Sequence, residues 1–310
     1  CKLTGIPYLV TVHGRQSTFR SRKLLKCLGD YTLAVCEELK KQLVEVLEVD
    51  ANKIEVLRNG FEIEGKRSNQ LINQNNCVTF ITRFTGPKGE LAINLIKHIL
   101  NSFSENEIQL TVVGGKSVPD ELKQYESKIC FTGFVNEVKE YIQKSRVVIA
   151  SGRTAIESIL LEIPTIAIGE AETIGLVTEK TLKRGLETNF GDMAEIEKKF
   201  DFKKIVDDIR SSISGTQLSE TELKRLKEII ISEYDILPIY KRILSLYRTL
   251  YVSKKKREIP VIMYHRVITT ENEKGVNGIY VTEEQFEEHL KILKSKGFQS
   301  ISIDTLISKL

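Results

Sequence analysis

The sequence predicts an α/β protein with two Rossmann-like domains, each built on a doubly wound parallel sheet, followed by the start of a third α/β unit. Three observations predict this fold class. Short runs of β-branched and apolar residues alternate with longer stretches of helical periodicity, which is the rhythm of βαβ units. These runs are apolar throughout, as expected of strands buried on both faces. A polar, asparagine-rich segment at 64–76 separates one set of runs from the next.

Residues 1–63 are predicted to be part of the first domain, with strands in "YLVTV", "YTLAVC" and "IEVL". Three strands are few for a stable sheet, so we interpret this region as the C-terminal half of a truncated N-terminal domain. The chain starts at Cys1 and ends inside a helical pattern at Leu310, and we expect both ends to be truncated. Residues 64–76 are the predicted linker.

Residues 77–252 are predicted to form a second, fuller domain. Its strands are expected in "VTFIT", "IQLTVVG", "ICFTG", "RVVIAS" and "PTIAIG". From Asp201 onwards the pattern is wholly helical, and Pro238 is predicted to break or kink the last helix. Residues 253–258 are a predicted basic linker. Residues 259–310 begin a third unit, with a strand in "EIPVIMYHRV" and an amphipathic helix that stops at Gly297.

The composition limits the classes of partner. Hydrophobic residues make up 41% and charged residues 28% of the 310 residues, as in ordinary soluble globular proteins. The formal net charge of +4 is too small to indicate a nucleic-acid partner. The dense basic run from Lys254 to Arg257 is interpreted as a solvated linker, with contact to an anionic membrane surface as the alternative. The widely spaced, odd number of cysteines favours a reducing compartment.

Polar residues and glycines follow several predicted strands, where doubly wound sheets bind their ligands. His13 ends the first strand, and it is either a cleft residue or a histidine of the core. Gly115 follows "IQLTVV". Arg83 and Lys88 flank a Gly-Pro turn that leads into a helix expected to begin near Gly89. Two cations at a helix N-terminus suit a diphosphate, although basic residues beside a loop can also be merely solvated.

The segment "SGRTAIES" places small residues where a strand turns into a helix. Such residues let a ligand approach the backbone closely. The candidate nucleotide-binding residues here are Ser151, Gly152, Arg153, Thr154 and Glu157. Glu157 lies one turn inside the helix, where a carboxylate can accept hydrogen bonds from ribose hydroxyls, or it is an ordinary surface glutamate. Glu162, one turn further on, is expected to be a surface residue.

The order of these motifs resembles the retaining glycosyltransferases of the GT-B fold, the group called family four. The resemblance rests on "TVHG", "LRNGFEIE", "ITRFTGPKGE", "LTVVGG" and the stretch from "ICFTGF" to "PTIAIGE", and it covers about residues 6–186. It implies a nucleotide-diphosphate sugar bound by the second domain and a glycan or lipid-linked acceptor bound by the first. Arg83 and Lys88 match the pair that binds the diphosphate, Glu157 matches the ribose-binding glutamate, and His13 matches the cleft histidine.

The resemblance further implies electrostatic catalysis, in which cations stabilise the departing diphosphate while a hydroxyl attacks an oxocarbenium-like centre. No metal or other cofactor is expected, and the sequence shows no clustered His, Asp or Cys ligands. One departure concerns Ile149, which stands where family-four members commonly have an earlier glutamate. The "SGRTAIE" segment is closer to relatives such as the lipid-linked N-acetylglucosamine transferase and the non-hydrolysing sugar epimerase.

The third unit resembles the start of a polysaccharide deacetylase, through "IPVIMYHRV" and "GIYVTEEQFEEHLKILKSKGFQSISIDTL". The metal-binding residues of such enzymes would lie beyond Leu310. We expect a cytoplasmic protein, since nucleotide sugars are used there, with the inner face of the membrane as an alternative location.

The leading hypothesis is a transferase that acts in polysaccharide or cell-surface glycan synthesis. Two others remain: an epimerase of nucleotide sugars with the same fold, and a non-catalytic module that binds nucleotide sugars or serves as a scaffold. Product analysis separates the transferase from the epimerase. Donor binding without turnover identifies the scaffold.

Overall fold

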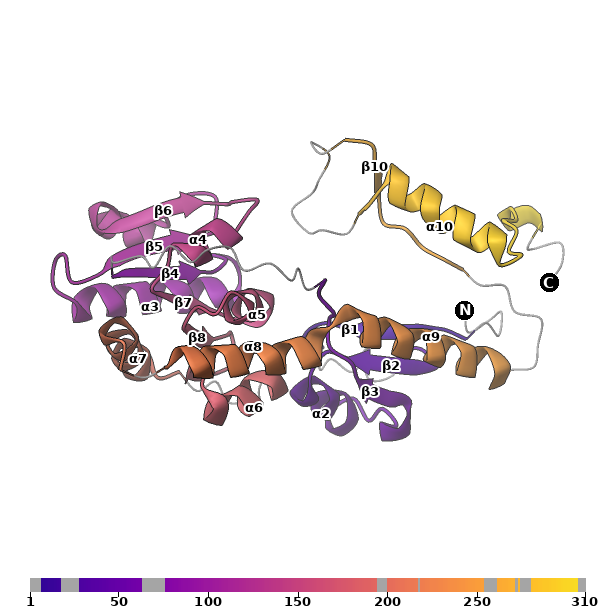
Figure 1. Ribbon diagram of the computed structural model, residues 1–310, viewed down its shortest axis with the longest axis horizontal. Coiled ribbons are helices and arrows are strands. Elements are labelled where there is room, and N and C mark those ends of the chain that lie inside the picture. The colour runs from indigo at the N-terminus through magenta and orange to yellow at the C-terminus, as the bar shows by residue number, and fades with distance from the viewer. Residues whose placement is uncertain are drawn as a thin grey trace. The chain divides into compact units, whose positions relative to one another are not determined.

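The computed structural model describes residues 7–17, 28–62, 76–193, 200–216, 218–253, 261–270, 273 and 280–305. The chain divides into two compact units. The larger spans Leu9–Leu250 and contains two separate sheets, and the smaller contains the residues from Tyr251 onwards (Figure 1). The predicted linker at 64–76 lies, except for Asn76, outside the described residues, and so does most of the basic linker at 253–258.

The first sheet has three parallel strands in the order β1-β2-β3. These are β1 (Leu9–Val12), β2 (Tyr31–Ala34) and β3 (Ile54–Val56), as the sequence predicts. Helix α2 (Glu37–Glu45) and the 3-10 helix η1 (Ala51–Lys53) connect β2 to β3. The apolar side of α2, with Leu39 and Leu43 fully buried, packs on the sheet and closes a small core.

The second sheet has six strands in the order β6-β5-β4-β7-β8-β9. Its strands are β4 (Cys77–Ile81), β5 (Gln109–Val113), β6 (Ile129–Gly133), β7 (Val147–Ala150), β8 (Thr165–Ile168) and β9 (Thr173–Leu176). All pairs are parallel except β8 with β9, which is antiparallel and was not predicted. Because β5 and β7 lie on opposite sides of β4, the strand order reverses direction at the β4–β7 pair.

Helices cover both faces of this sheet (Figure 1). They are α3 (Pro87–Ser102), η2 (Asp120–Lys128), α4 (Lys139–Gln143), α5 (Gly152–Leu160), α6 (Glu179–Glu187), α7 (Phe202–Ser214) and α8 (Glu220–Tyr234). Alternate residues of β7 face opposite ways: Val147 and Ile149 pack in the core with α3 and α7, whereas Val148 and Ala150 pack with α5 and α8. The strand is therefore apolar throughout, which is why its sequence predicts burial on both faces.

One helix boundary agrees with the predictions and another differs. Helix α3 begins at Pro87, near Gly89 as predicted, because proline suits the first turn of a helix, where its missing N–H is not needed. The break in the last helical stretch falls at Asp235, between α8 and α9 (Ile236–Ser253), and Pro238 lies in the first turn of α9. No described helix is long and apolar enough to cross a membrane.

The smaller unit contains two short parallel strands, β10 (Val267–Ile268) and β11 (Val281–Thr282), and helix α10 (Glu283–Ser295). A capping box between Thr282 and Gln285 starts α10, and Gly297 follows its end with a φ of 81°, as the sequence predicts. The strand predicted in "EIPVIMYHRV" is shorter than expected, because among the described residues of that segment only Val267 is paired.

An ion pair joins α9 to the first sheet. Arg242 donates hydrogen bonds of 2.7 and 2.6 Å to the carboxylate of Glu55, which also accepts one from the Tyr31 hydroxyl. These bonds, chiefly those from Arg242, lower the pKa of Glu55 below its usual value.

Because the pKa of Glu55 is lowered on folding, the stabilisation is present above the unfolded value of 4.5 and is lost as pH falls through the folded value. We expect Glu55→Gln to lose up to about 1 kcal/mol at neutral pH, since Arg242 is half exposed and water screens the pair. The loss should shrink as the pH drops below about 4.5. Urea denaturation across this pH range measures the loss at neutral pH and its decrease in acid. Glu126→Gln, at an exposed residue of η2, is the control, and an equal loss in both variants would contradict the prediction.

Candidate functional site

The carboxyl ends of β4 and β7 form the point where the sheet order reverses. In doubly wound sheets the connections leave such a point toward opposite faces, and a crevice that binds ligands opens between them. The loop after β4 carries Arg83 and leads to Lys88 in the first turn of α3. Ser151 follows β7 and precedes α5. The topology therefore brings two predicted segments to the place where this crevice is expected.

Lys88 is the centre of a polar cluster at this crevice. Its Nζ donates hydrogen bonds to Ser151 Oγ at 2.8 Å and to Asp192 Oδ2 at 2.9 Å. Asp192 Oδ1 lies 2.7 Å from the same nitrogen, close enough for an ion pair but outside hydrogen-bond geometry. The side chains of Lys88 and Asp192 are only 17% and 19% exposed. The structure thus brings the predicted residues Lys88 and Ser151 into direct contact.

Arg83 is also paired with a carboxylate, but it is far more exposed. Its guanidinium lies 3.5 Å from the carboxylate of Glu170, which follows β8, and the Arg83 side chain is 63% exposed. Exposed pairs of this kind contribute little free energy. Arg83 can therefore leave Glu170 for an anionic ligand at small cost.

Gly115 lies at the neighbouring strand end, after β5, with a φ of 78°. A Cβ at this position would lie 2.8 Å from the ring of Phe84, in the loop after β4. The Phe84 ring in turn packs against Phe131 of β6. The rings of Phe84 and Phe131 therefore lie beside the place where a ligand is predicted to approach Gly115.

The first turns of α5 contain the other predicted nucleotide-binding residues. Arg153 donates a 2.8 Å hydrogen bond to Glu157 one turn later, and its guanidinium lies over the ring of Phe61. The Glu157 side chain is 31% exposed, and Thr154 is half-buried. Within the described part of the chain, no hydrogen bond or ion pair joins Glu157 to the Lys88 cluster. Gly152, in contrast, lies against Asp192.

His13 follows β1 of the first sheet and is exposed, so it is not a histidine of the described core. Val12, directly before it, shares a buried apolar cluster with Met193, which directly follows Asp192. Val12 and Met193 therefore contribute to the same core of the first sheet. No hydrogen bond or ion pair among the described residues links His13 to Lys88 or Ser151.

Two carboxylates of this region were missed by the sequence analysis, and a third was misjudged. No local sequence pattern points to Asp192 or Glu170, because each pairs with a cation that is distant in the sequence. Glu162 was expected at the surface, and this prediction is wrong: the residue is 7% exposed and its carboxylate accepts a 2.8 Å hydrogen bond from Lys227 of α8. A buried carboxylate needs such a partner.

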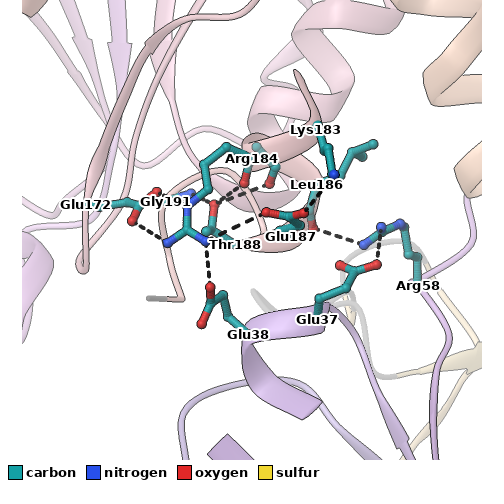
Figure 2. Close-up of polar contacts among 11 residues, drawn as sticks. Glu37, Glu38, Arg58, Glu172, Lys183, Arg184, Leu186, Glu187, Thr188 and Gly191 are labelled. Carbon is teal, nitrogen blue, oxygen red and sulfur yellow. Dashed lines mark hydrogen bonds and ion pairs between the residues drawn. The ribbon is translucent and has the colours of Figure 1, made fainter. Parts of the chain in front are cut away.

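Ion pairs connect the two sheets beside the crevice (Figure 2). Arg184 of α6 binds Glu172 through two 2.8 Å hydrogen bonds and also binds Glu38 of α2. The two hydrogen bonds to Glu172, together with the one to Glu38, raise the pKa of Arg184 above its usual value despite partial burial.

Arg58, just after β3, is buried and makes a second connection between the sheets. It donates to Glu37 at 2.9 Å, to Glu233 of α8 at 3.0 Å and to the backbone carbonyl of Leu186 at 3.0 Å. These partners lie on three different helices. Arg58 thereby joins the first sheet to the C-terminal end of α6 and to α8.

A hollow of about 610 Å³ lies at the opposite edge of the second sheet. It is lined by residues at the amino ends of strands, including Asn76, Gln109 and Lys128. None of the predicted site residues lines it, and ligands of such sheets bind at carboxyl ends. We therefore place the candidate site at the Lys88 cluster. In the described ranges, no group of three or more His, Cys, Asp or Glu residues could hold a metal ion.

Residues 75–189 match the family model for glycosyl transferases group 1, and this span includes Arg83, Lys88 and Glu157. No curated protein matches the sequence. A glycosyltransferase structure from Rickettsia africae is 17% identical with a TM-score of 0.58, and the match covers 78% of this chain and 70% of that one. Anabaena Alr3699/HepE, solved with UDP, is 16% identical with a TM-score of 0.57, covering 78% and 72%.

TarM from S. aureus, solved with Fondaparinux, alpha-GlcNAc-glycerol and UDP, is 16% identical with a TM-score of 0.53. That match covers 71% of this chain but only 44% of TarM. At these identities the solved structures establish the fold, and they confirm the predicted α/β class. Residues 75–189 are therefore similar to a glycosyl transferases group 1 domain, and the chain has an α/β fold that matches solved glycosyltransferase structures.

Proposed function

We propose that this protein transfers a sugar from a nucleoside-diphosphate sugar to a glycan or lipid-linked acceptor, in polysaccharide or cell-surface glycan synthesis. The observation that carries the proposal is the contact of Lys88 with Ser151 at the crevice between β4 and β7. It places a half-buried cation beside the N-terminus of α5, where backbone N–H groups attract anions. The family match over the same residues supplies the reaction class.

In this proposal Lys88 and Arg83 bind the diphosphate of the donor. Gly115 and the start of α5, with Ser151, Gly152, Arg153 and Thr154, border the nucleotide, and Glu157 accepts hydrogen bonds from the ribose once Arg153 releases it. His13 lies toward the transferred sugar and the acceptor. The core that Val12 and Met193 share supports this placement, since Met193 directly follows Asp192.

The reaction breaks the bond between the anomeric carbon and the diphosphate oxygen, and forms a bond from that carbon to an acceptor oxygen, which loses its proton. The leaving diphosphate, already anionic in the donor, gains one further negative charge as its bond breaks, and nearby cations stabilise this charge most in the transition state. We assign this work to Lys88 and Arg83. Retention of anomeric configuration, transfer without a metal, and membership of family four are part of the proposal.

The remaining assignments rest on sequence motifs. Residues 259–310 are proposed to begin a polysaccharide-deacetylase-like domain. The proposed location is the cytoplasm, where nucleotide sugars are available, with the basic run from Lys254 to Arg257 as a contact to an anionic inner membrane face.

Calorimetric titration of the full chain with UDP and GDP tests the site. We expect one nucleotide to bind, and Lys88→Ala and Glu157→Ala to weaken it by about 1–3 kcal/mol each, as expected for lost charged hydrogen bonds. The loss of binding free energy in Arg83→Ala should lie at the lower end of this range, because the Arg83 side chain is 63% exposed.

Arg225→Ala, at an exposed residue that pairs with Glu179 away from the crevice, is the matched control and should bind like the wild type. If the folded wild type binds no nucleotide, the donor site is wrong. Nucleotide binding without transfer to any of a set of glycan and lipid-linked acceptors would identify a binding module instead.

A further inference from the structure

Asp192 occupies the place that an anionic ligand of Lys88 would take. Its carboxylate contacts Lys88 Nζ through both oxygens, at 2.7 and 2.9 Å. It also lies at the start of α5, since a Cβ on Gly152 would be 2.9 Å from Asp192 Oδ2, and glycine alone leaves this room. A cation and a helix N-terminus are the two features that attract a diphosphate. The carboxylate of Asp192 lies beside both.

The turn at residues 188–193 fixes Asp192 in this place. Asn189, Phe190 and Gly191 have φ values of 52°, 56° and 90°, a left-handed run that costs about 1–2 kcal/mol for each residue other than glycine. The buried hydroxyl of Thr188 accepts a 3.0 Å hydrogen bond from the Gly191 amide. Phe190 is fully buried. These contacts over-determine the turn, so that it holds its strained backbone.

Both sides of the turn are anchored. The carbonyl of Gly191 accepts hydrogen bonds from the amides of Ala171 and Glu172, at 3.0 and 3.1 Å. Met193 is 4% exposed and packs in the core of the first sheet. The backbone of Asp192 therefore cannot move away from Lys88 without disturbing two cores.

Lys88 differs from Asp192 in this respect. Its ammonium is carried on a flexible four-carbon stem with three donors, of which Ser151 and Asp192 use two. When an anion enters the crevice, the ammonium is the group that turns toward it. The carboxylate stays beside it and repels the incoming negative charge.

We propose that Asp192 is an internal counter-ion that competes with the donor diphosphate for Lys88 and so weakens the binding of the nucleoside-diphosphate product. The inference rests on the proposed function, and it adds a group that regulates affinity at the same site. The expected benefit is faster product release, because each turnover leaves a diphosphate bound to Lys88.

The variant Asp192→Asn tests the proposal, since asparagine keeps the size of the side chain and one acceptor oxygen for Lys88 but removes the charge. Inorganic pyrophosphate, UDP and GDP are titrated against the full wild-type chain and the variant. We expect the variant to bind pyrophosphate about three- to tenfold more tightly than the wild type does, and the same gain for whichever nucleotide the wild type binds. The gain should shrink at high salt, because it comes from charge.

Asp207→Asn, at an exposed residue of α7, is the matched control and should leave both affinities unchanged. Asp192→Ser, also uncharged and smaller, replaces the asparagine variant if that protein does not fold, with the same expected direction. If the wild type binds UDP or GDP and the uncharged variant binds equally or more weakly, the inference falls and the proposed function stands. If neither protein binds UDP, GDP or pyrophosphate, both fall.

Discussion

Replacing Arg58 by alanine is expected to lower the free energy of unfolding by about 3 kcal/mol, one of the largest effects of any single substitution in this chain. The Arg58 side chain is 8% exposed, and three groups accept its hydrogen bonds. Alanine leaves the Leu186 carbonyl without this donor in a buried setting. Glu37 and Glu233 are nearly half exposed, so water solvates them in part and limits the loss.

Urea denaturation followed by circular dichroism measures this loss. Arg225→Ala is the matched control, because Arg225 of α8 also joins two helices but is 63% exposed, and it should cost less than about 1 kcal/mol. Arg58→Lys should recover less than half of the stability, since one ammonium cannot direct donors to three separated partners as the guanidinium fork does. Equal losses in Arg58→Ala and Arg225→Ala would show that Arg58 does not stabilise the contact between the sheets.

Replacing Gly169 by alanine is expected to cost about 3–5 kcal/mol. A Cβ at this position would lie 2.1 Å from the carbonyl carbon of Gly191 and 2.3 Å from the amide nitrogen of Asp192. Both are backbone atoms, so no side-chain rotation relieves the overlap. The segments must separate, and the hydrogen bonds of Ala171 and Glu172 to Gly191 break with them.

The midpoint of thermal unfolding measures this effect. Gly14→Ala is the control, because nothing lies within 4 Å of a Cβ built there, and it should leave the midpoint near that of the wild type. The same displacement moves Asp192 from Lys88, so Gly169→Ala should also alter pyrophosphate affinity where the protein remains folded. An unchanged midpoint would mean that the turn at residues 188–193 is not packed as described.

Most strands of the two sheets could be predicted from the sequence because they are short and largely apolar runs. The clearest is β7, which is apolar at every position since alternate residues enter different cores. The missed strand β9 is an antiparallel edge whose run is interrupted by Gly175, which has a φ of 82°. An edge strand that contains a glycine has too few consecutive apolar residues to be recognised in the sequence.

The cations of the candidate site could be predicted as well, because they follow strands and flank a helix start. Asp192 could not, since its contact with Lys88 spans 104 positions and depends on a turn of left-handed residues. Arg58 was missed for a similar reason: its partners come from three helices. The bounds of the predicted domains and the roles of all the predicted site residues, Lys88 and Arg83 included, stay predictions.

The adjacency of Asp192 and Met193 has a consequence for recombining domains. One residue faces the crevice of the second sheet, and the next fills the core of the first. A chimera that joins residues 76–250 to a foreign first domain would need apolar side chains that bury Met193. It would also need a carboxylate in the place of Glu38 to bind Arg184. Transplanting residues 28–62 with the second domain keeps Glu38 and most of the apolar cluster that contains Met193, with the loss of Val12. A crossover before residue 28 should therefore be tolerated better than one in the linker.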